Sequence, residues 1–239
     1  MHAVTELGKQ RRVLAMMAKA PHRGEVKTRL IPACTVGEAA LLQRAFLLDL
    51  LEHPWPAVVE RQLWLAGQDE TLESEAIALG WAVRAQGEGD LGERMRAVFV
   101  SEAPSATLVI GADVPHLRSA DVEGAWGAIE AGSLVLGPAV DGGYWAIGTS
   151  RPEASLFTGI PWSTSQVLTA TIERANALEL PVTCLPTRRD VDDVADLARL
   201  WQHLNESRTA AVRHTRRALD ELLRTSPLAE RMATPRKGS

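Results

Sequence analysis

Apolar residues along this chain form short continuous runs that alternate with stretches of helical periodicity. The run over residues 13–17 leads into a loop with proline and glycine, which suits a strand buried on both faces of a mostly parallel sheet. Over 37–51 apolar residues recur at helical spacing and stop before two prolines, which predicts a helix. Further strands are predicted over 62–66, 81–85, 107–110, 133–136, 143–148 and 182–185, and further helices over 70–79, 92–101, 119–130, 165–177 and 194–204. This alternation predicts a doubly wound α/β sheet.

The charge balance changes near residue 206. Residues 1–206 hold 18 basic and 27 acidic side chains, whereas residues 207–239 hold 8 basic and 3 acidic ones. We predict one domain over 1–206 and a basic helical tail over 207–239, partly disordered. The tail begins as an amphipathic helix and frays near Pro227. It is either a solvated, partly docked appendage or the contact of a homo-oligomer.

Composition excludes several classes of protein. With 239 residues, 46% of them hydrophobic, the chain is long enough to bury one sizeable core. A net charge of −4 argues against a general nucleic-acid binder. Cys34 and Cys184 are too far apart to indicate a disulfide framework or a cysteine zinc site. Because no apolar stretch approaches a signal core or a membrane span, we expect a soluble cytoplasmic protein without a membrane partner.

The loop after the first predicted strand is basic. In open α/β sheets ligands bind beyond the carboxyl ends of the strands. Here Lys19, Arg23, Lys27 and Arg29 surround Gly24, so the loop could wrap phosphate groups. It lacks the spacing of the Gly-Lys-Ser/Thr phosphate loop, which disfavours a kinase-type site. The alternative is a solvated charged loop.

Aspartates follow the later strands. Asp113 comes after the strand at 107–110 and could bind Mg²⁺, a cation that prefers oxygen ligands, or could cap the next helix. Asp190 and Asp192 lie before the helix at 194–204. They could bring a second carboxylate to the same metal, or Asp192 or Asp193 could cap that helix.

Three other loops carry candidate binding residues. Asp141 precedes a glycine pair that lets backbone approach a ligand, and it could contact that ligand or hold the turn. Gln86, in a glycine-containing loop, could pair with the edge of a nucleobase. The segment 161–166 could cap a helix or grip an anionic acceptor.

Six ordered motifs over about residues 13–200 resemble one family. They are Ala-Lys-Ala-Pro-x-x-Gly-x-x-Lys-Thr-Arg-Leu, Gly-Asp-Leu-Gly-Glu-Arg-Met, Gly-x-Asp-x-Pro-x-Leu, Gly-Pro-x-x-Asp-Gly-Gly-Tyr-Trp, Pro-Trp-Ser-Thr and Asp-Val-Asp-x-x-x-Asp-Leu. Together they resemble the DUF2064 family, which is classed with glycosyltransferases of the nucleotide-diphospho-sugar transferase superfamily and is related to phospholactate guanylyltransferases. The resemblance implies a GT-A-like, Rossmann-like three-layer αβα fold with a mixed, mostly parallel sheet of about seven strands. It also implies a nucleotide donor and Mg²⁺ or Mn²⁺.

The resemblance and the loops together assign roles to residues. The nucleotide would be bound by Ala18, Lys19, Gly24, Lys27, Arg29, Gln86, Gly89 and Asp113. The metal would be bound by Asp113, Asp190 and Asp192, and the catalytic residues would be Lys27, Arg29 and Asp141. The acceptor would lie against Gly142, Gly143, Tyr144, Trp145, Trp162, Ser163, Thr164 and Ser165.

Three functions remain open at this point. In glycosyl transfer from a nucleotide-diphospho-sugar to a small-molecule acceptor, an inverting reaction needs a base such as Asp141. In nucleotidyl transfer from an NTP, an ionised acceptor attacks the α-phosphorus and no dedicated base is needed. The aromatic pair at 144–145 favours a sugar ligand, whereas the lack of an obvious His or Glu base favours nucleotidyl transfer. A nucleotide-binding protein without turnover is the third.

Overall fold

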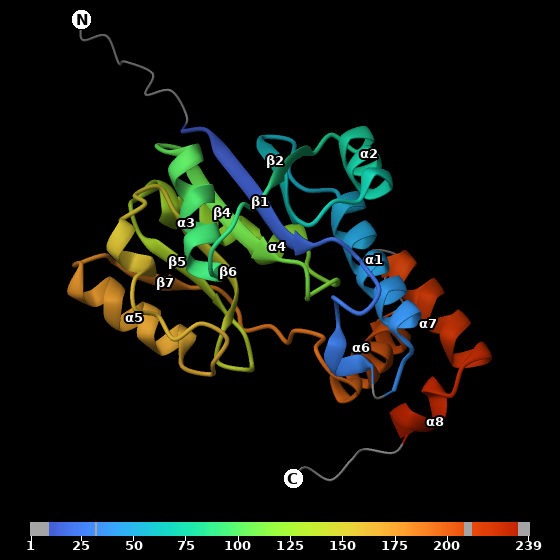
Figure 1. Ribbon diagram of the computed structural model, residues 1–239. Coiled ribbons are helices and arrows are strands. Elements are labelled where there is room, and N and C mark those ends of the chain that lie inside the picture. Colours follow the sequence, from blue (N-terminus) through green and yellow to red (C-terminus); the bar gives the residue numbers. More distant parts are fainter. Residues whose placement is uncertain (1–9, 32, 208–211, 234–239) are drawn as a thin grey trace, which may run out of the picture.

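The computed structural model describes residues 10–31, 33–207 and 212–233, and a seven-stranded sheet lies at its centre (Figure 1). The strands are β1 (Arg12–Lys19), β2 (Val59–Ala66), β3 (Ala82–Ala85), β4 (Ala106–Gly111), β5 (Leu134–Pro138), β6 (Tyr144–Thr149) and β7 (Val182–Cys184). Their spatial order is β3-β2-β1-β4-β6-β5-β7. Only β6 runs antiparallel to its neighbours among these strands. The predicted mixed, mostly parallel sheet is therefore confirmed.

Helices follow the strands where the periodicity places them. They are α1 (Val36–Glu52), α2 (Glu70–Ala78), α3 (Leu91–Glu102), α4 (Ser119–Glu130), α5 (Val167–Ala177) and α6 (Val194–Ser207), with short 3-10 turns η1 (Thr28–Leu30) and η2 (Ala154–Phe157). Capping boxes start two of them, Thr35 with Glu38 at α1 and Asp90 with Glu93 at α3. Within the described ranges, no helix is both long and apolar enough to cross a membrane.

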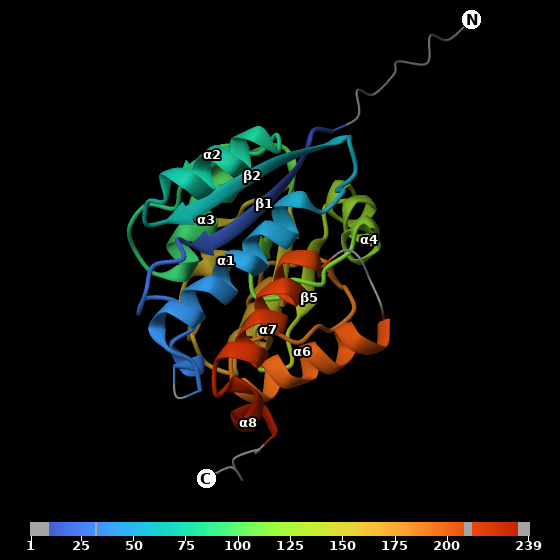
Figure 2. The same ribbon diagram turned by 90° about the vertical axis from the view of Figure 1, so that its right-hand side faces the viewer.

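The sheet is covered on both faces, which explains its continuous apolar runs. In β1, Leu14 and Met16 face the core beneath α1, α2 and α4, while Ala15 and Met17 face the core beneath α3 and α5. Figures 1 and 2 show α3 and α1 on opposite sides of the strands. Alternate residues of one strand therefore pack into two separate cores, as the predicted three-layer αβα fold requires.

The described part of the tail packs against the body. Helices α7 (Arg213–Thr225) and α8 (Leu228–Ala233) lie over α1 and α6, as Figure 2 shows for α7. Leu219 and Leu228 are fully buried in a cluster with residues of α1 and α6. The expectation that the chain frays near Pro227 is wrong for residues 228–233, because Leu228 anchors α8. Residues 208–211 and 234–239 lie outside the described part, and the domain boundary at 206 stays a prediction.

The start of α7 is held by an acid from α1. The carboxylate of Asp49, only 2% exposed, accepts hydrogen bonds from the backbone N–H groups of His214 and Thr215, both at 2.8 Å. Nearby, Glu52 accepts from His214 Nε2 at 2.8 Å. The apolar face of α7, which suggested a contact between copies, is thus buried within the chain.

Candidate functional site

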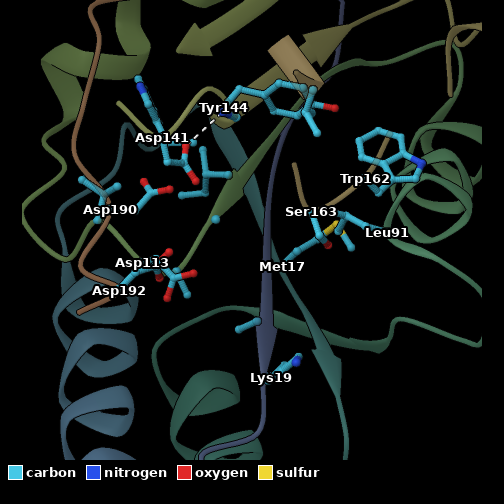
Figure 3. A pocket seen from close by; sticks show the side chains of 18 of the residues that line it. Met17, Lys19, Leu91, Asp113, Asp141, Tyr144, Trp162, Ser163, Asp190 and Asp192 are labelled. Atoms are coloured by element: carbon cyan, nitrogen blue, oxygen red, sulfur yellow. Dashed lines mark hydrogen bonds between the residues drawn. The ribbon is translucent and has the colours of Figure 1, made fainter. Parts of the chain in front are cut away.

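A cavity of about 840 Å³ opens at the carboxyl ends of β1 and β4. This is where the strand order reverses around β1, the place where open α/β sheets bind ligands. Its volume falls within the range of about 300–1,000 Å³ that is usual for ligand sites. Figure 3 shows its two ends, with aspartates at one and Tyr144, Trp162 and Ser163 at the other.

Most predicted site residues line this cavity. The nucleotide set is represented by Ala18, Lys19, Lys27, Arg29, Gln86, Gly89 and Asp113, the acids by Asp141, Asp190 and Asp192, and the acceptor set by Gly143, Tyr144, Trp145, Trp162, Ser163, Thr164 and Ser165. Two predicted residues are not part of the lining. Gly24 is exposed in the turn before Lys27, and the carbonyl of Gly142 accepts a hydrogen bond from Leu168 N at 2.9 Å.

Lys27 is the centre of the charged end. Its side chain is 4% exposed, and its ammonium donates to the carboxylate of Asp113 and, at 2.7 Å, to the carbonyl of Val191. Asp192 Oδ1 lies 3.8 Å from the same nitrogen. The backbone of Lys27 has φ 48°, an uncommon conformation for a residue other than glycine, just before η1. A solvated loop therefore does not describe Lys27, whereas Arg29 is 73% exposed and pairs with Asp192 Oδ2 at 3.4 Å.

The acids come from loops that the tertiary structure joins. Val191 N donates to the carbonyl of Asp113 at 2.9 Å, which holds the 190–192 segment against the end of β4. Asp190 lies beside them, and its Oδ1 is buried without a partner in the described part of the chain. Burial, and then the charges of Asp113, Asp141 and Asp192, raise the pKa of Asp190 to about 7. An unpartnered buried carboxylate among other acids is a site that a cation would stabilise.

Asp113 and Asp192 are better placed to bind one metal ion together than all three aspartates are. In the described residues, no group of three or more histidine, cysteine, aspartate or glutamate side chains is arranged to hold an ion. Asp113 and Asp192 do converge, on the ammonium of Lys27. Mg²⁺ commonly uses one or two carboxylates together with substrate phosphates, so this pair suits it. The predicted ligand role of all three stays a prediction.

Helix capping does not occupy that pair. At α6 the cap is Asp193, whose Oδ1 accepts from Asp196 N at 2.9 Å. At α4 the capping contact runs between Asp121 and the backbone of Arg118 at 2.9 Å. The side chains of Asp113 and Asp192 are thus directed to the cavity instead of a helix end.

Asp141 holds a turn at the same end. Its Oδ1 accepts from Gly143 N at 2.9 Å, drawn as the dashed line in Figure 3. The residue is exposed, so its carboxylate reaches the cavity as well. Both alternatives that the sequence left open for Asp141 are compatible with this position.

Gln86 is fixed by backbone contacts. Its Nε2 donates to the carbonyls of Ala18 at 2.8 Å and Trp64 at 2.9 Å, at the ends of β1 and β2. With both amide hydrogens engaged, only Oε1 can contact a nucleotide, and only as an acceptor. Arg94, whose Nε donates to the carbonyl of Gly89 at 3.0 Å, also lines the cavity. The sequence reasoning missed Arg94, although its charge within the Gly-Asp-Leu-Gly-Glu-Arg-Met motif was a usable signal.

The aromatic end differs in detail from the expectation. Trp145 is 2% exposed, its Nε1 donates to the carbonyl of Pro186 at 3.1 Å, and its ring lies against Gly137. It forms part of the core wall, because strand alternation turns it inward. Trp162 is half-buried against Gly92 and borders the cavity beside the exposed Ser163. The aromatic surface available to a ligand is therefore that of the half-buried Trp162 and Tyr144, both of which line the cavity.

Three hydroxyl-bearing residues lie at this end, and only one of them is engaged in a turn. Thr164 Oγ1 donates to the carbonyl of Pro161 at 2.7 Å and accepts from Gln166 N at 3.2 Å, so it stabilises the turn. Ser163 and Ser165 are exposed and lack hydrogen-bonded partners for their hydroxyls in the described residues. These two serines remain available to an acceptor.

Comparison with solved structures identifies the type of fold. The crystal structure of a "putative nucleotide-diphospho-sugar transferase" from Desulfovibrio desulfuricans G20 shares 30% identity, with a TM-score of 0.78 over 90% of this chain and 97% of that chain. A cytidylyltransferase from Leptospira borgpetersenii serovar Hardjo-bovis (strain JB197) has 13% identity and a TM-score of 0.53 over 96% and 99%. CMP:2-keto-3-deoxy-manno-octonic acid synthetase complexed with CTP has 14% identity and a TM-score of 0.50 over 82% and 99%. The last two indicate the fold alone.

The fold and the cavity at its switch point thus define a transferase of the nucleotide-diphospho-sugar transferase type. Residues 52–164 match the family described as "Uncharacterized protein conserved in bacteria (DUF2064)". The chain belongs to the DUF2064 family. A search of curated proteins found no match.

Proposed function

We propose that this protein is a metal-dependent glycosyltransferase that takes its sugar from a nucleotide-diphospho-sugar and passes it to a small-molecule acceptor. The observation that carries the proposal is the division of one cavity into a charged end and an aromatic, hydroxyl-bearing end. The charged end suits the diphosphate of the donor, and the aromatic, hydroxyl-bearing end suits the acceptor.

The donor's diphosphate belongs at the charged end. Lys19, Arg29 and Arg94 line the cavity, and they can pair with phosphate oxygens, although Arg29 also lies 3.4 Å from Asp192 Oδ2. Asp113 and Asp192 would hold Mg²⁺ or Mn²⁺, which when bound offsets the charge of the departing nucleoside diphosphate.

The nucleobase and the acceptor would each have their own contacts. Gln86 Oε1 would accept a hydrogen bond from an N–H group of the nucleobase. The acceptor would lie against Trp162, whose ring suits the flat face of a sugar, with Ser163 and Ser165 as hydrogen-bonding groups. In an inverting reaction Asp141 would accept the proton of the attacking hydroxyl.

Nucleotidyl transfer from an NTP to a phosphorylated acceptor is the second candidate, and one observation favours it. Asp141 interacts electrostatically with Asp190 and Asp192, so it lies with the acids that would bind the metal. An inverting glycosyltransferase needs its base on the side of the sugar opposite the leaving diphosphate. An ionised acceptor attacking the α-phosphorus needs no such base.

Product analysis separates the candidates. The protein is incubated with Mn²⁺ and either a panel of nucleotide-diphospho-sugars or a panel of NTPs, after a thermal-shift screen has chosen the nucleobase. Release of a nucleoside diphosphate that depends on added acceptor supports glycosyl transfer. Pyrophosphate released from NTPs supports the second candidate. Stabilisation by nucleotides without any turnover on broad acceptor panels would support a nucleotide-binding protein instead.

Two variants calibrate that assay. Asp113→Asn removes the carboxylate at the end of β4 and should abolish turnover. Glu123→Gln is the matched control, because this exposed acid of α4 does not line the cavity. Unchanged turnover in Asp113→Asn would refute the metal role of this residue.

Cytoplasmic location and oligomeric state stay predictions.

A further inference from the structure

Lys27 occupies the point where the two best-placed metal ligands converge. Its ammonium contacts Asp113 and lies 3.8 Å from Asp192 Oδ1, and its third neighbour is the carbonyl of Val191 at 2.7 Å. Two carboxylates and a carbonyl form an all-oxygen set, the type of ligand that Mg²⁺ and Mn²⁺ prefer. The ring centroid of Phe46 lies 5.3 Å from the same nitrogen, which further stabilises a cation there.

We propose that Lys27 is a built-in counter-ion that a divalent cation must displace. The displaced ammonium then turns toward the phosphates of the donor, so that metal and Lys27 exchange places as the donor binds. This inference rests on the proposed function, because it takes Asp113 and Asp192 as the metal ligands of that site.

Electrostatics couples the movement of Lys27 to the binding of both the metal and the donor. Withdrawing the ammonium alone would leave the half-buried Asp113 without its cation and Asp192 with only the exposed Arg29, 3.4 Å away, which is unfavourable for partly buried charges. A divalent cation replaces the lost charge, and donor phosphates provide a new partner for the released ammonium. Metal alone must compete with Lys27, whereas metal with donor does not. Metal and donor should therefore bind cooperatively.

The local backbone places Lys27 where such a movement is feasible. The residue lies between an exposed turn at Gly24 and the three-residue helix η1, and its side chain has four rotatable methylene bonds. Asp113 and Asp192 belong instead to segments tied by the hydrogen bond from Val191 N to Asp113 O. The lysine can move while the carboxylates stay in place.

The central test is the affinity of the full-length protein for Mn²⁺ alone, measured from the electron paramagnetic resonance signal of free Mn²⁺. Lys27→Met keeps the length of the side chain and removes its charge. We expect it to bind Mn²⁺ about tenfold or more tightly than the wild type, because the competing cation is gone. A role for Lys27 in phosphate binding alone predicts no gain. Unchanged or weaker Mn²⁺ binding by Lys27→Met would overturn the inference.

Lys19→Met is the matched control. Lys19 lines the same cavity but is exposed and has no ion pair with an acid in the described residues. Loss of its charge acts on the metal only through screened attraction, so its Mn²⁺ affinity should stay within about threefold of the wild type. An equal gain in both variants would indicate a general effect of charge and would also overturn the proposal.

A second measurement uses the unaltered protein. The chain has only four lysines, at positions 9, 19, 27 and 237, so acylation of each can be followed by mass spectrometry. Lys27, 4% exposed, should react slowly, and Mn²⁺ should raise its rate relative to that of Lys19. No change in the Lys27 rate at saturating Mn²⁺ contradicts displacement, even if Lys27→Met does not fold.

The outcomes separate this inference from the proposed function. If Asp113→Asn loses Mn²⁺ binding while Lys27→Met gains none, the metal site stands and the exchange fails. If wild type, Asp113→Asn and Lys27→Met all bind Mn²⁺ equally, both the metal site and the exchange fail. Whether nucleotides raise the melting temperature of the protein in the absence of metal tests donor binding independently of both the metal site and the exchange.

Discussion

Asp190 should destabilise the folded protein at neutral and alkaline pH. Burial, with the charges of Asp113, Asp141 and Asp192, raises its pKa from 3.8 to about 7. Between these two values the unfolded chain has released a proton that the folded protein still holds. The free energy of unfolding therefore falls as pH rises from about 4 to 7 and is constant above that range. Below pH 4 both states hold the proton and the penalty disappears.

The size of the effect follows from the shift. At 1.36 kcal/mol per pKa unit, the raised pKa costs about 4 kcal/mol at pH 8, where the folded protein carries the ionised carboxylate, and under about 2 kcal/mol at pH 5, where the folded protein keeps Asp190 protonated. Asp190→Asn keeps the shape of the side chain and removes its charge. In EDTA the variant should therefore be more stable than the wild type, by more than twice as much at pH 8 as at pH 5.

Urea unfolding at the two pH values measures this difference directly. Glu123→Gln, which removes an exposed acid outside the cavity, serves as the control and should change stability by less than about 0.5 kcal/mol. A stability gain of equal size at both pH values would show that charge is not its cause. If Asp190→Asn is less stable than the wild type at pH 8, the ionised carboxylate of Asp190 does not destabilise the folded protein.

Three other substitutions test separate parts of the structure. Asp113→Asn should abolish the stabilisation that Mn²⁺ adds to nucleotide binding in thermal-shift assays and leave the circular dichroism spectrum unchanged, because Asp113 lies at a strand end and caps no helix. Asp49→Ala should lower the free energy of unfolding in urea by about 1–3 kcal/mol, since two backbone N–H groups of α7 lose their acceptor; a change below about 0.5 kcal/mol would contradict that role. Gly92→Ala puts a methyl group against the ring of Trp162 and should raise the KM for the acceptor more than that for the donor; an equal rise in both would place the acceptor elsewhere.

Much of the site can be predicted from the sequence because of one property of parallel sheets. Their strands end at one edge, so loops far apart along the chain, such as those carrying Lys19, Asp113 and Asp192, are expected to meet. Apolar runs and helical spacing also predict all seven strands and the helices α1 to α6, because these patterns depend only on local burial.

The direction of individual side chains is not predictable in the same way. Trp145 follows the glycine pair in a motif, yet the pleat of β6 turns its ring into the core against Gly137. In the tail, the apolar face of α7 is equally suited to a second copy or to α1. The hydrogen bond between the start of α7 and Asp49 depends on how α1 packs on the sheet.

The amino-acid sequence by itself determined the alternation of strands and helices, the family, and the loops that bear charge, since these are properties of neighbouring residues. Only the tertiary structure decided that Lys27 pairs with Asp113, that Lys27 and Arg29 both lie beside Asp192, and that Asp190 Oδ1 has no partner among the described residues. Lys27 lies 86 positions from Asp113 in the chain. Over such separations, pairing and burial depend on how whole layers pack, and it is burial that turns an ordinary aspartate into one that resists ionisation.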